Sequence, residues 1–355
     1  MKNIILVGLM GAGKTTVGRR LSQKIGWEFV DTDSLVEKNC GTSVNVIFEV
    51  EGEKGEINIK IDKEVRGYIN QTLTSPEKSK LRIGSIVWVI KRTDGKDKYK
   101  ITNKPKVEGA IVAIQTNNGA IKALVGGYDF YSNKYNRAIQ AYRQPGSAIK
   151  PFIFGAALEK GISASTIVND LPVNFDAEST GGVLWEPSNF NDVYLGPISI
   201  KEALTKSQNM VSIRLIKRIG PSFAQGYIKR FGFESARNPP YFTLALGAGA
   251  VTPLQLAVGY SIIANGGFYV KPYFIDRIVD SGGRLVRRYE PMKSGDEKLR
   301  VIDARHAFII NNILSEVIKT GTGKKARSLG RPDLAGKTGT TNDAFDAWFA
   351  GYQPT

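Results

Sequence analysis

A serine and a lysine stand three residues apart at a predicted helix start, and this pair constrains the chain more than any other feature. They are Ser147 and Lys150, within the segment Gln144-Pro145-Gly146-Ser147-Ala148-Ile149-Lys150-Pro151-Phe152. Because Pro-Gly marks a turn and the residues after Lys150 are apolar almost all round, we expect a buried helix with the serine in its first turn. One helical turn brings both side chains to the same face, where the lysine amine can take the proton of the serine hydroxyl.

The single histidine of the sequence, His306, lies in an apolar helical pattern. This position disfavours a Ser-His-Asp triad and leaves a lysine as the base. A second Ser-x-x-Lys match, from Ser75 to Lys78, stands in a polar run that has no apolar face to bury. A nucleophile at the start of a buried helix also gains from the helix dipole and from free backbone N–H groups. We therefore predict Ser147, and not Ser75, as the nucleophile.

Two later motifs supply further polar groups. Ser207-Gln208-Asn209 follows a helical stretch and could present a hydroxyl and an amide to the same cleft. Lys337-Thr338-Gly339-Thr340 precedes the strand-like run 346–352, and Gly336 and Gly339 would let a ligand backbone approach a strand edge. The same four residues recur at 319–322, at the end of a predicted helix, where Gly321 is typical of a C-cap.

Ser-x-x-Lys, Ser-x-Asn and Lys-Thr-Gly in this order resemble the transpeptidase domain of class A penicillin-binding proteins of the 1A type. The flanking segments that carry the resemblance are 143–147, 185–187, 202–204, 244–247 and 335–343. The resemblance covers residues 109–355. It implies the α/β fold of this family and of serine β-lactamases, in which an antiparallel sheet is packed between helices.

The resemblance also implies a reaction, which is acyl transfer on peptidoglycan stem peptides that end in D-Ala-D-Ala. β-Lactam antibiotics would acylate the same serine, and no cofactor is implied. Ser147 would attack the penultimate carbonyl, with Lys150 as its base. Ser207 would relay a proton to the leaving group, and Asn209 would orient Lys150 and the substrate amide.

The later Lys-Thr-Gly motif would bind the substrate in this family. Lys337 and Thr338 would anchor the substrate carboxylate, with Gly339 and Thr340 beside them. The backbone N–H groups of Ser147 and Thr340 would form the oxyanion hole.

The N-terminal segment carries a phosphate-binding motif. The apolar run 4–7, a glycine-rich loop and a helical stretch follow one another in the order that a P-loop requires. The loop and Lys14 would bind the phosphates of ATP, and Thr15 would bind Mg²⁺. With Asp33 for the shikimate hydroxyls and Asp31 near the metal, the segment resembles shikimate kinase. The candidate residues are Gly8, Gly11, Gly13, Lys14, Thr15, Asp31 and Asp33.

The resemblance to shikimate kinase ends near residue 53. The arginine that grips the substrate carboxylate in that family is missing, because the corresponding pair is Glu56 and Ile57. So short a segment is too little chain to bury a kinase core. We therefore expect three parts: a truncated shikimate-kinase-like P-loop segment (1–53), a partial β-rich, OB-like linker (54–108) and a transpeptidase domain truncated at its C-terminus (109–355). Two alternatives stay open: the chain is a shikimate kinase, or it is a fusion product without function.

Several segments predict strands and turns. The runs 57–61 and 83–90 are strand-like, and 93–96 is a plausible hairpin turn. The runs 109–114 and 120–125 flank Thr116-Asn117-Asn118-Gly119, which predicts a hairpin at the start of the transpeptidase sheet.

Charge also changes along the chain. Residues 1–53 carry 6 basic and 7 acidic residues, whereas the remainder carries 43 basic and 26 acidic residues. Aromatic residues do not interleave with this basic excess, so we expect a solvated surface near anionic lipid or cell-wall polymer and no nucleic-acid partner. No apolar run approaches 18 residues, which predicts no membrane span. Family members face the periplasm from the inner membrane, but without a signal or anchor this sequence predicts a cytoplasmic location.

Overall fold

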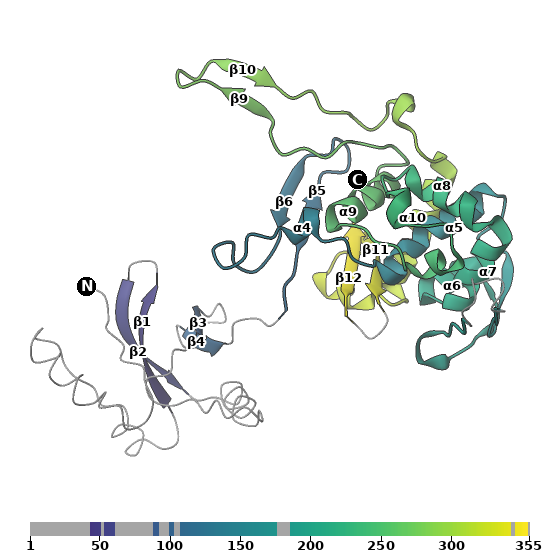
Figure 1. Cartoon of the computed structure of the whole chain (residues 1–355), viewed down its shortest axis with the longest axis horizontal. Helices are drawn as coiled ribbons and strands as arrows, with labels where there is room; N and C mark the ends of the chain where they lie inside the picture. The colour runs from purple at the N-terminus through teal and green to yellow at the C-terminus, as the bar shows by residue number, and fades with distance from the viewer. Residues whose placement is uncertain are drawn as a thin grey trace, which may run out of the picture. The chain divides into compact units, whose positions relative to one another are not determined.

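The computed structural model describes residues 43–50, 53–60, 88–91, 99–102, 107–175, 185–341 and 345–353. The chain divides into two compact units, residues 1–107 and residues 108–355. Figure 1 labels helices and strands of both units.

The first unit contains two antiparallel strand pairs. Strand β1 (Ser43–Val50) pairs with β2 (Glu53–Lys60), and β3 (Trp88–Lys91) pairs with β4 (Tyr99–Thr102). β1 is rich in β-branched residues, which favour strands. The strands predicted within 57–61 and 83–90 are confirmed over residues 57–60 and 88–90. Strand β2 begins at Glu53, so the β1–β2 pair spans the predicted boundary between the first part (1–53) and the linker (54–108). This boundary stays a proposal.

The second unit is a helical body with short antiparallel hairpins (Figure 1). Its strands are β5 (Ile111–Ile114), β6 (Ile121–Val125), β7 (Ile167–Asp170), β8 (Gly196–Ser199), β9 (Arg277–Val279), β10 (Leu285–Arg288), β11 (Ala335–Thr340) and β12 (Ala347–Tyr352). Its α-helices are α4 (Arg137–Gln140), α5 (Lys150–Glu159), α6 (Ile200–Lys206), α7 (Asn209–Ile219), α8 (Pro221–Lys229), α9 (Pro253–Ala264) and α10 (Ala304–Lys319). Its 3₁₀ turns are η1 (Gly146–Ile149), η2 (Phe190–Asp192), η3 (Ser235–Arg237), η4 (Phe242–Leu246), η5 (Glu297–Leu299) and η6 (Lys324–Leu329).

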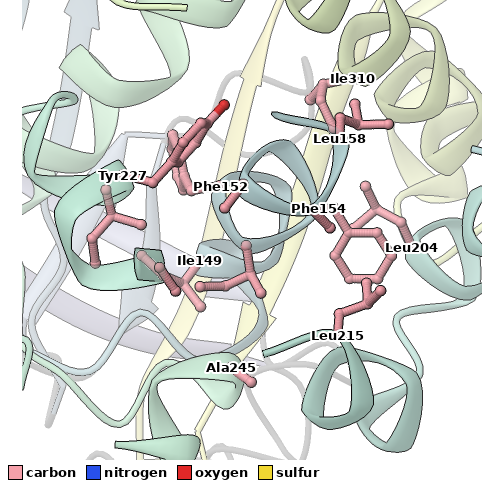
Figure 2. Close-up of a cluster of buried hydrophobic side chains, with 14 of the residues drawn as sticks. Ile149, Phe152, Phe154, Leu158, Leu204, Leu215, Tyr227, Ala245 and Ile310 are labelled. Carbon is pink, nitrogen blue, oxygen red and sulfur yellow. The ribbon is translucent and has the colours of Figure 1, made fainter. Parts of the chain in front are cut away.

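Helix α5 is the centre of the hydrophobic core, and its residues from Lys150 to Leu158 are all buried. Helices α6, α7, α8 and α10 pack around it. Figure 2 shows the side chains that meet there, among them Phe154, Leu204 and Leu215. Burial of this helix on all sides confirms the prediction made from its apolar sequence.

Aromatic rings fix α5 against the helices beside it. Phe152 meets Phe231 and Phe233 edge to face, with ring centroids 4.9 Å apart in both pairs. Tyr260 of α9 packs on the same ring and donates a hydrogen bond to Ala148 O at 2.8 Å. Because Ala148 follows Ser147, this packing holds the start of α5 in place. Loss of the Phe152 ring would cost about 3–5 kcal/mol.

The hairpin predicted from 109–114 and 120–125 is confirmed, and the strand-like run predicted at 346–352 is the strand β12. β5 pairs with β6 around a turn in which Gly119 has φ of +80° and the Asn118 side chain accepts a hydrogen bond from Ala120 N. β11 pairs with β12 from Ala335 opposite Tyr352 to Thr340 opposite Ala347. In the described residues the strands pair two by two, so the expected antiparallel sheet takes the form of small two-stranded sheets packed with helices.

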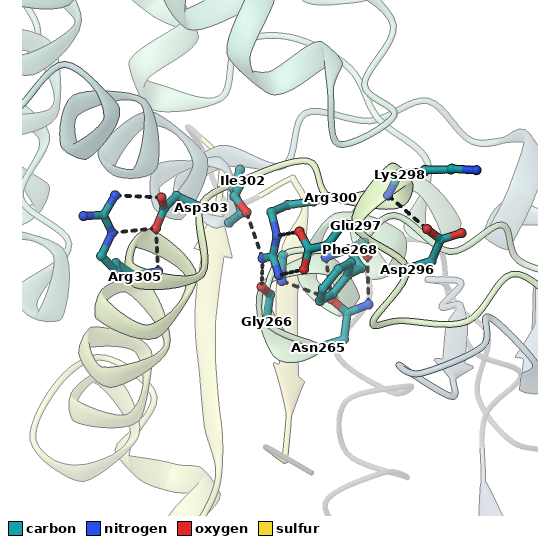
Figure 3. A network of polar contacts seen from close by, with 11 residues as sticks. Asn265, Gly266, Phe268, Asp296, Glu297, Lys298, Arg300, Ile302, Asp303 and Arg305 are labelled. Carbon is teal, nitrogen blue, oxygen red and sulfur yellow. Dashed lines mark hydrogen bonds and ion pairs between the residues drawn. The ribbon is translucent and has the colours of Figure 1, made fainter.

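Arg300 joins the two ends of the segment between α9 and α10 (Figure 3). Its guanidinium donates to Gly266 O at 2.9 Å, pairs with Glu297 and lies 4.1 Å from the centroid of the Phe268 ring. Asp303 then accepts a hydrogen bond from Arg305 N and caps α10. The end of α9 is thereby tied to the start of α10, whose other end leads to η6 and β11.

Candidate active site

Ser147 lies in the 3₁₀ turn η1, which leads directly into α5. The turn requires a glycine at Gly146, where φ is +52°. Ser147 is half-buried, whereas Ala148 and Ile149 after it are fully buried. The serine thus lies where the core meets the surface, one turn earlier than the first turn of the α-helix in which the sequence predicted it.

Lys150 is the first residue of α5, and its side chain is fully buried. Its Nζ donates to Ser207 O and to Asn209 Oδ1, both at 2.6 Å, and lies 3.4 Å from Ser207 Oγ. The Ser-x-x-Lys and Ser-x-Asn motifs, which are far apart in the sequence, are therefore in contact.

Ser207 occupies the junction between α6 and α7. It is the C-cap of α6 and has φ of 63° and ψ of 37°, a left-handed conformation that is uncommon for residues other than glycine. Its carbonyl and its hydroxyl both reach Lys150, and Asn209 starts the next helix. A strained residue at a junction of this kind is typical of a functional site.

Lys337 lies in β11 and reaches the same hydroxyl. It is fully buried, and its Nζ donates to Ser207 Oγ at 2.8 Å and to Thr338 O at 3.0 Å. Ser207 Oγ therefore lies between the amines of Lys150 and Lys337.

Burial lowers the pKa of both lysines. It brings the pKa of Lys337 to about 7. Burial also lowers the pKa of Lys150 well below its usual value; the charge of Lys337 lowers it further, and the charge of Asp170 acts in the opposite direction. A lowered pKa favours the neutral amine, and a neutral amine can accept a proton, which is what a general base requires.

The backbone N–H of Lys150 donates to Ser147 O, but no hydrogen bond joins the side chains of the two residues in the described part of the chain. Across the residues that the structure describes, the bonds donated by Lys150 Nζ go to Ser207 and Asn209. Hydrogen bonds of this kind are often long in a free enzyme and tighten when the substrate binds. The transfer of the Ser147 proton to Lys150 stays a prediction.

Strand β11 packs closely against the turn that carries Ser147. A Cβ on Gly146 would lie 2.4 Å from Thr340 O, and a Cβ on Gly339 would lie 2.4 Å from Pro145 O. These contacts correct one prediction, because the space beside Gly339 belongs to η1 and not to a ligand backbone. The space beside Gly336 belongs to β12, where a Cβ would meet Ala350 O at 2.8 Å.

Two polar contacts fasten the β11–β12 hairpin to the segment before Ser147. Arg143 donates to both carboxylate oxygens of Asp346, from Nε at 2.9 Å and Nη2 at 2.9 Å. Trp348 Nε1 donates to Gln144 O at 2.9 Å. A bidentate pair is directional as well as attractive, so it sets the spacing between Thr340 and Ser147.

The earlier Lys-Thr-Gly copy also reaches the site, which the sequence did not predict. Helix α10 ends with Thr320 as its C-cap, in place of the predicted Gly321. Gly321 is needed for space instead, since a Cβ there would lie 2.3 Å from Thr205 O. The next residue, Thr322, forms a hydrogen bond with Thr338, with the two Oγ1 atoms 2.7 Å apart.

A buried polar pair behind Asn209 was also missed. Asp170 is fully buried and Asn189 nearly so, and Asn189 Oδ1 accepts a hydrogen bond from Asn209 N at 2.8 Å. The sequence singled out 185–187 just before Asn189, and that stretch is the one signal that could have pointed to it.

Other predicted residues lie outside the described ranges. They are Ser75 and the P-loop candidates Gly8, Gly11, Gly13, Lys14, Thr15, Asp31 and Asp33. Within the described ranges, His, Cys, Asp and Glu side chains do not gather in threes as a metal site would need. The helices of the same ranges are too short or too polar to cross a membrane.

The chain is similar in sequence to known protein families and to curated proteins. The family model of the penicillin binding protein transpeptidase domain matches residues 109–355, and that of shikimate kinase matches residues 10–57. Among curated proteins, the chain is 43% identical over 312 residues to penicillin-binding protein 1A of Neisseria lactamica. It is 40% identical over 314 residues to penicillin-binding protein 1A of Pseudomonas aeruginosa. These matches cover 87% and 76% of this chain, and the chain spans 38% of the length of each relative.

Solved structures agree with these matches. Penicillin-binding protein 1A from Haemophilus influenzae is 30% identical with a TM-score of 0.76, and the match covers 92% of this chain and 54% of that one. Penicillin-binding protein A from M. tuberculosis, solved as a penicillin G acyl-enzyme complex, shares the fold with a TM-score of 0.58 at 20% identity; that match covers 70% of this chain and 66% of that one. The chain belongs to the penicillin-binding protein transpeptidase family.

Proposed function

We propose that the chain is a serine acyltransferase, a D,D-transpeptidase that cross-links peptidoglycan stem peptides ending in D-Ala-D-Ala. The contact that carries the proposal is Ser207 Oγ, held between the buried amines of Lys150 and Lys337 beside the Ser147 turn. Buried lysines with lowered pKa values activate hydroxyl groups without a histidine.

Ser147 is the nucleophile of the proposed reaction. When Lys150 is neutral, its two N–H bonds point to Ser207 O and Asn209 Oδ1, which leaves its lone pair to take the Ser147 proton. Ser147 Oγ then forms a bond to the penultimate D-Ala carbonyl carbon. The N–H groups of Ser147 and Thr340 stabilise the oxyanion that results.

Ser207 completes the first half of the reaction. Its hydroxyl gives a proton to the nitrogen of the terminal D-Ala as the amide bond breaks, and Lys150 or Lys337, both within reach of Oγ, restores that proton. The product is an ester of Ser147. The amine of a second stem peptide then attacks this ester and releases Ser147.

The substrate carboxylate binds to β11 in this proposal. Lys337 supplies a positive charge, and the hydroxyl of Thr338, which the hydroxyl of Thr322 contacts, supplies a hydrogen bond. Gly339 allows β11 to lie against the Ser147 turn, so that carboxylate and carbonyl bind a fixed distance apart. A β-lactam antibiotic offers the same carboxylate and an amide carbonyl, so it acylates Ser147 as well.

The test is D-Ala release from a stem-peptide analogue that ends in D-Ala-D-Ala. We expect release by the parent chain, none by Ser147→Ala, and unchanged release by Ser75→Ala, which alters the other Ser-x-x-Lys serine. Release that survives Ser147→Ala would contradict the proposal. Since the family members that the sequence resembles face the periplasm, we place the proposed reaction there; the cytoplasmic location expected from the sequence stays a prediction.

A kinase activity is the second candidate, and the match over residues 10–57 favours it. Lys14 and Thr15 would hold ATP and Mg²⁺. That match spans too little chain for a kinase core, so we expect no shikimate-dependent ADP release. ADP release above background that Lys14→Met abolishes would restore the kinase alternative.

A further inference from the structure

A buried carboxylate and a buried amide lie behind the candidate active site. Asp170 is the last residue of β7 and is fully buried; Asn189 directly precedes η2 and is 2% exposed. Neither residue contacts Lys150 through a hydrogen bond of its own. A chain of hydrogen bonds leads from Asp170 through Asn189 to Asn209, which binds Lys150.

Asp170 fixes the orientation of the Asn189 side chain. Asn189 Nδ2 donates to Asp170 Oδ1 at 2.9 Å, to Asp170 Oδ2 at 3.0 Å and to Val193 O at 3.0 Å. Leu195 N donates to the same carboxylate at 3.0 Å. Since the acceptors around Asn189 Nδ2 require its NH₂ group, the oxygen of the amide must point the other way.

That oxygen caps helix α7. Asn189 Oδ1 accepts from Asn209 N at 2.8 Å and from Met210 N at 3.1 Å. The N-cap residue of α7 itself, Gln208, makes no capping bond with its side chain, so Asn189 supplies the cap from a distant part of the chain.

The capped residue is the one that binds Lys150. Asn209 Nδ2 donates to Ser188 O at 2.7 Å, next to Asn189, which turns Asn209 Oδ1 toward Lys150 Nζ at 2.6 Å. Both the backbone and the side chain of Asn209 are therefore held by the segment 188–189, whose own position depends on Asp170.

The charges around Lys150 are few. Lys337 in β11 and Asp170 in β7 are the charged groups that act on its amine. Arg214 in α7 faces the same region and donates to Leu171 O at 2.6 Å. Asp170 therefore links position and charge, because it orders Asn209 and also opposes the effect of Lys337 on Lys150.

We propose that Asp170 and Asn189 are positioning residues for acylation, which hold the Asn209 carboxamide on Lys150 Nζ. This inference rests on the proposed acyl transfer at Ser147. Without the pair, α7 loses its cap and Asn209 can turn away, so that Lys150 loses one of its two short hydrogen bonds.

Exchange of the two side chains gives a sharp test. In Asp170→Asn, an NH₂ group would face the donors Asn189 Nδ2 and Leu195 N, so the pattern breaks although the shape is kept. In the double variant Asp170→Asn with Asn189→Asp, the carboxylate moves to position 189 and accepts from Asn209 N, from Met210 N and from the new amide at position 170. The donor pattern is then restored except at Val193 O, where a carboxylate oxygen takes the place of the amide donor and repels the carbonyl oxygen.

The measurement is benzylpenicillin acylation by stopped flow, which separates the dissociation constant of the first complex from the acylation rate constant. We expect Asp170→Asn to lower the rate constant about 10-fold to 100-fold, in line with the cost of leaving a buried donor without an acceptor, with an unchanged dissociation constant. We expect the double variant to recover most of the loss. Asn169→Asp, at the exposed residue before Asp170, is the matched control and should behave as the parent.

The pH profile separates positioning from simple stability. Removal of the Asp170 charge lowers the pKa of Lys150 further, so the acid limb of the acylation rate should move to lower pH in Asp170→Asn. A role in stability alone would lower the melting temperature but leave this limb in place. If Asp170→Asn does not fold, the acylation rate constant of the double variant is compared with that of the parent. A value near that of the parent supports the positioning role, and a loss of about 10-fold or more contradicts it.

The outcomes that overturn the inference are distinct from those that overturn the proposed function. A parent chain that is never acylated overturns both. A parent that is acylated, with Asp170→Asn within twofold of it and an unmoved acid limb, overturns the positioning role alone. A double variant as slow as the single variant or slower does the same.

Discussion

Two segments of the second unit have the same four residues and different surroundings. Lys319 to Thr322 lies at the end of α10, where Lys319 is exposed to solvent. Lys337 to Thr340 forms most of β11, where Lys337 is fully buried and contacts Ser207 Oγ. Burial brings the pKa of Lys337 to about 7. The two segments therefore differ because the fold removes Lys337 from water, which lowers its pKa.

The lysines should differ most when each is replaced. Lys337→Met removes the amine from Ser207 Oγ and the charge for the carboxylate, so penicillin acylation should fall by about 10²–10⁴-fold. Lys319→Met should leave the acylation rate within twofold. Rates measured by intact-protein mass spectrometry check both, and equal losses would break the comparison.

The glycines of the two segments should both matter for stability. A Cβ would lie 2.4 Å from Pro145 O at Gly339 and 2.3 Å from Thr205 O at Gly321. Thermal unfolding should show a loss of about 1–3 kcal/mol for either alanine variant. Only Gly339→Ala moves β11 against the Ser147 turn, so it alone should slow acylation, by about 10²-fold. If the folded Gly321→Ala variant were also acylated slowly, the two glycines would not differ in their effect on acylation.

The pH dependence of the acylation rate constant should also distinguish Lys337 from Lys319. Lys337 loses its charge as the pH rises through about 7, so the second-order acylation rate constant should fall above that pH. The fall approaches tenfold for each pH unit. Arginine stays charged, so Lys337→Arg should remove this alkaline limb even if its rate is lower throughout. Lys319→Arg should keep the limb where it is, and a limb that persists in Lys337→Arg belongs to another group.

The smallest effect concerns the threonine that joins the two segments. Thr322→Ala removes the contact with Thr338 Oγ1 and should weaken acylation about fivefold, the value of a hydrogen bond worth about 1 kcal/mol. Thr320→Ala is the control, because Thr320 bonds to Glu316 within its own helix. Equal acylation constants for the two variants would remove Thr322 from the site.

Local sequence was enough for the elements that local forces determine. The buried helix α5 followed from a continuous apolar run, and the β5–β6 hairpin followed from an Asn-Gly turn between two apolar runs. The strand β12 was also expected from the run 346–352, but its pairing with β11 was not predicted. The contact of β11 with η1 was not predicted either, because the close approach of Gly339 to Pro145 depends on two segments far apart in the chain.

The site itself could be predicted only in part. Spacing relates Ser147 to Lys150, but nothing local relates Lys150 to Ser207, Asn209 or Lys337; the family resemblance suggested that grouping and the structure brings it together. Asp170 had no signal at all, because a carboxylate that will be buried looks like one that will be exposed. The roles of all these residues, and of the P-loop residues outside the described ranges, stay predictions.

The position of the penicillin adduct tests most directly whether Ser147 is the nucleophile. Benzylpenicillin should add to the parent chain once, and peptide mapping should place the adduct on Ser147, with no adduct in Ser147→Ala. An adduct on Ser75, or an adduct that persists in Ser147→Ala, would contradict the account.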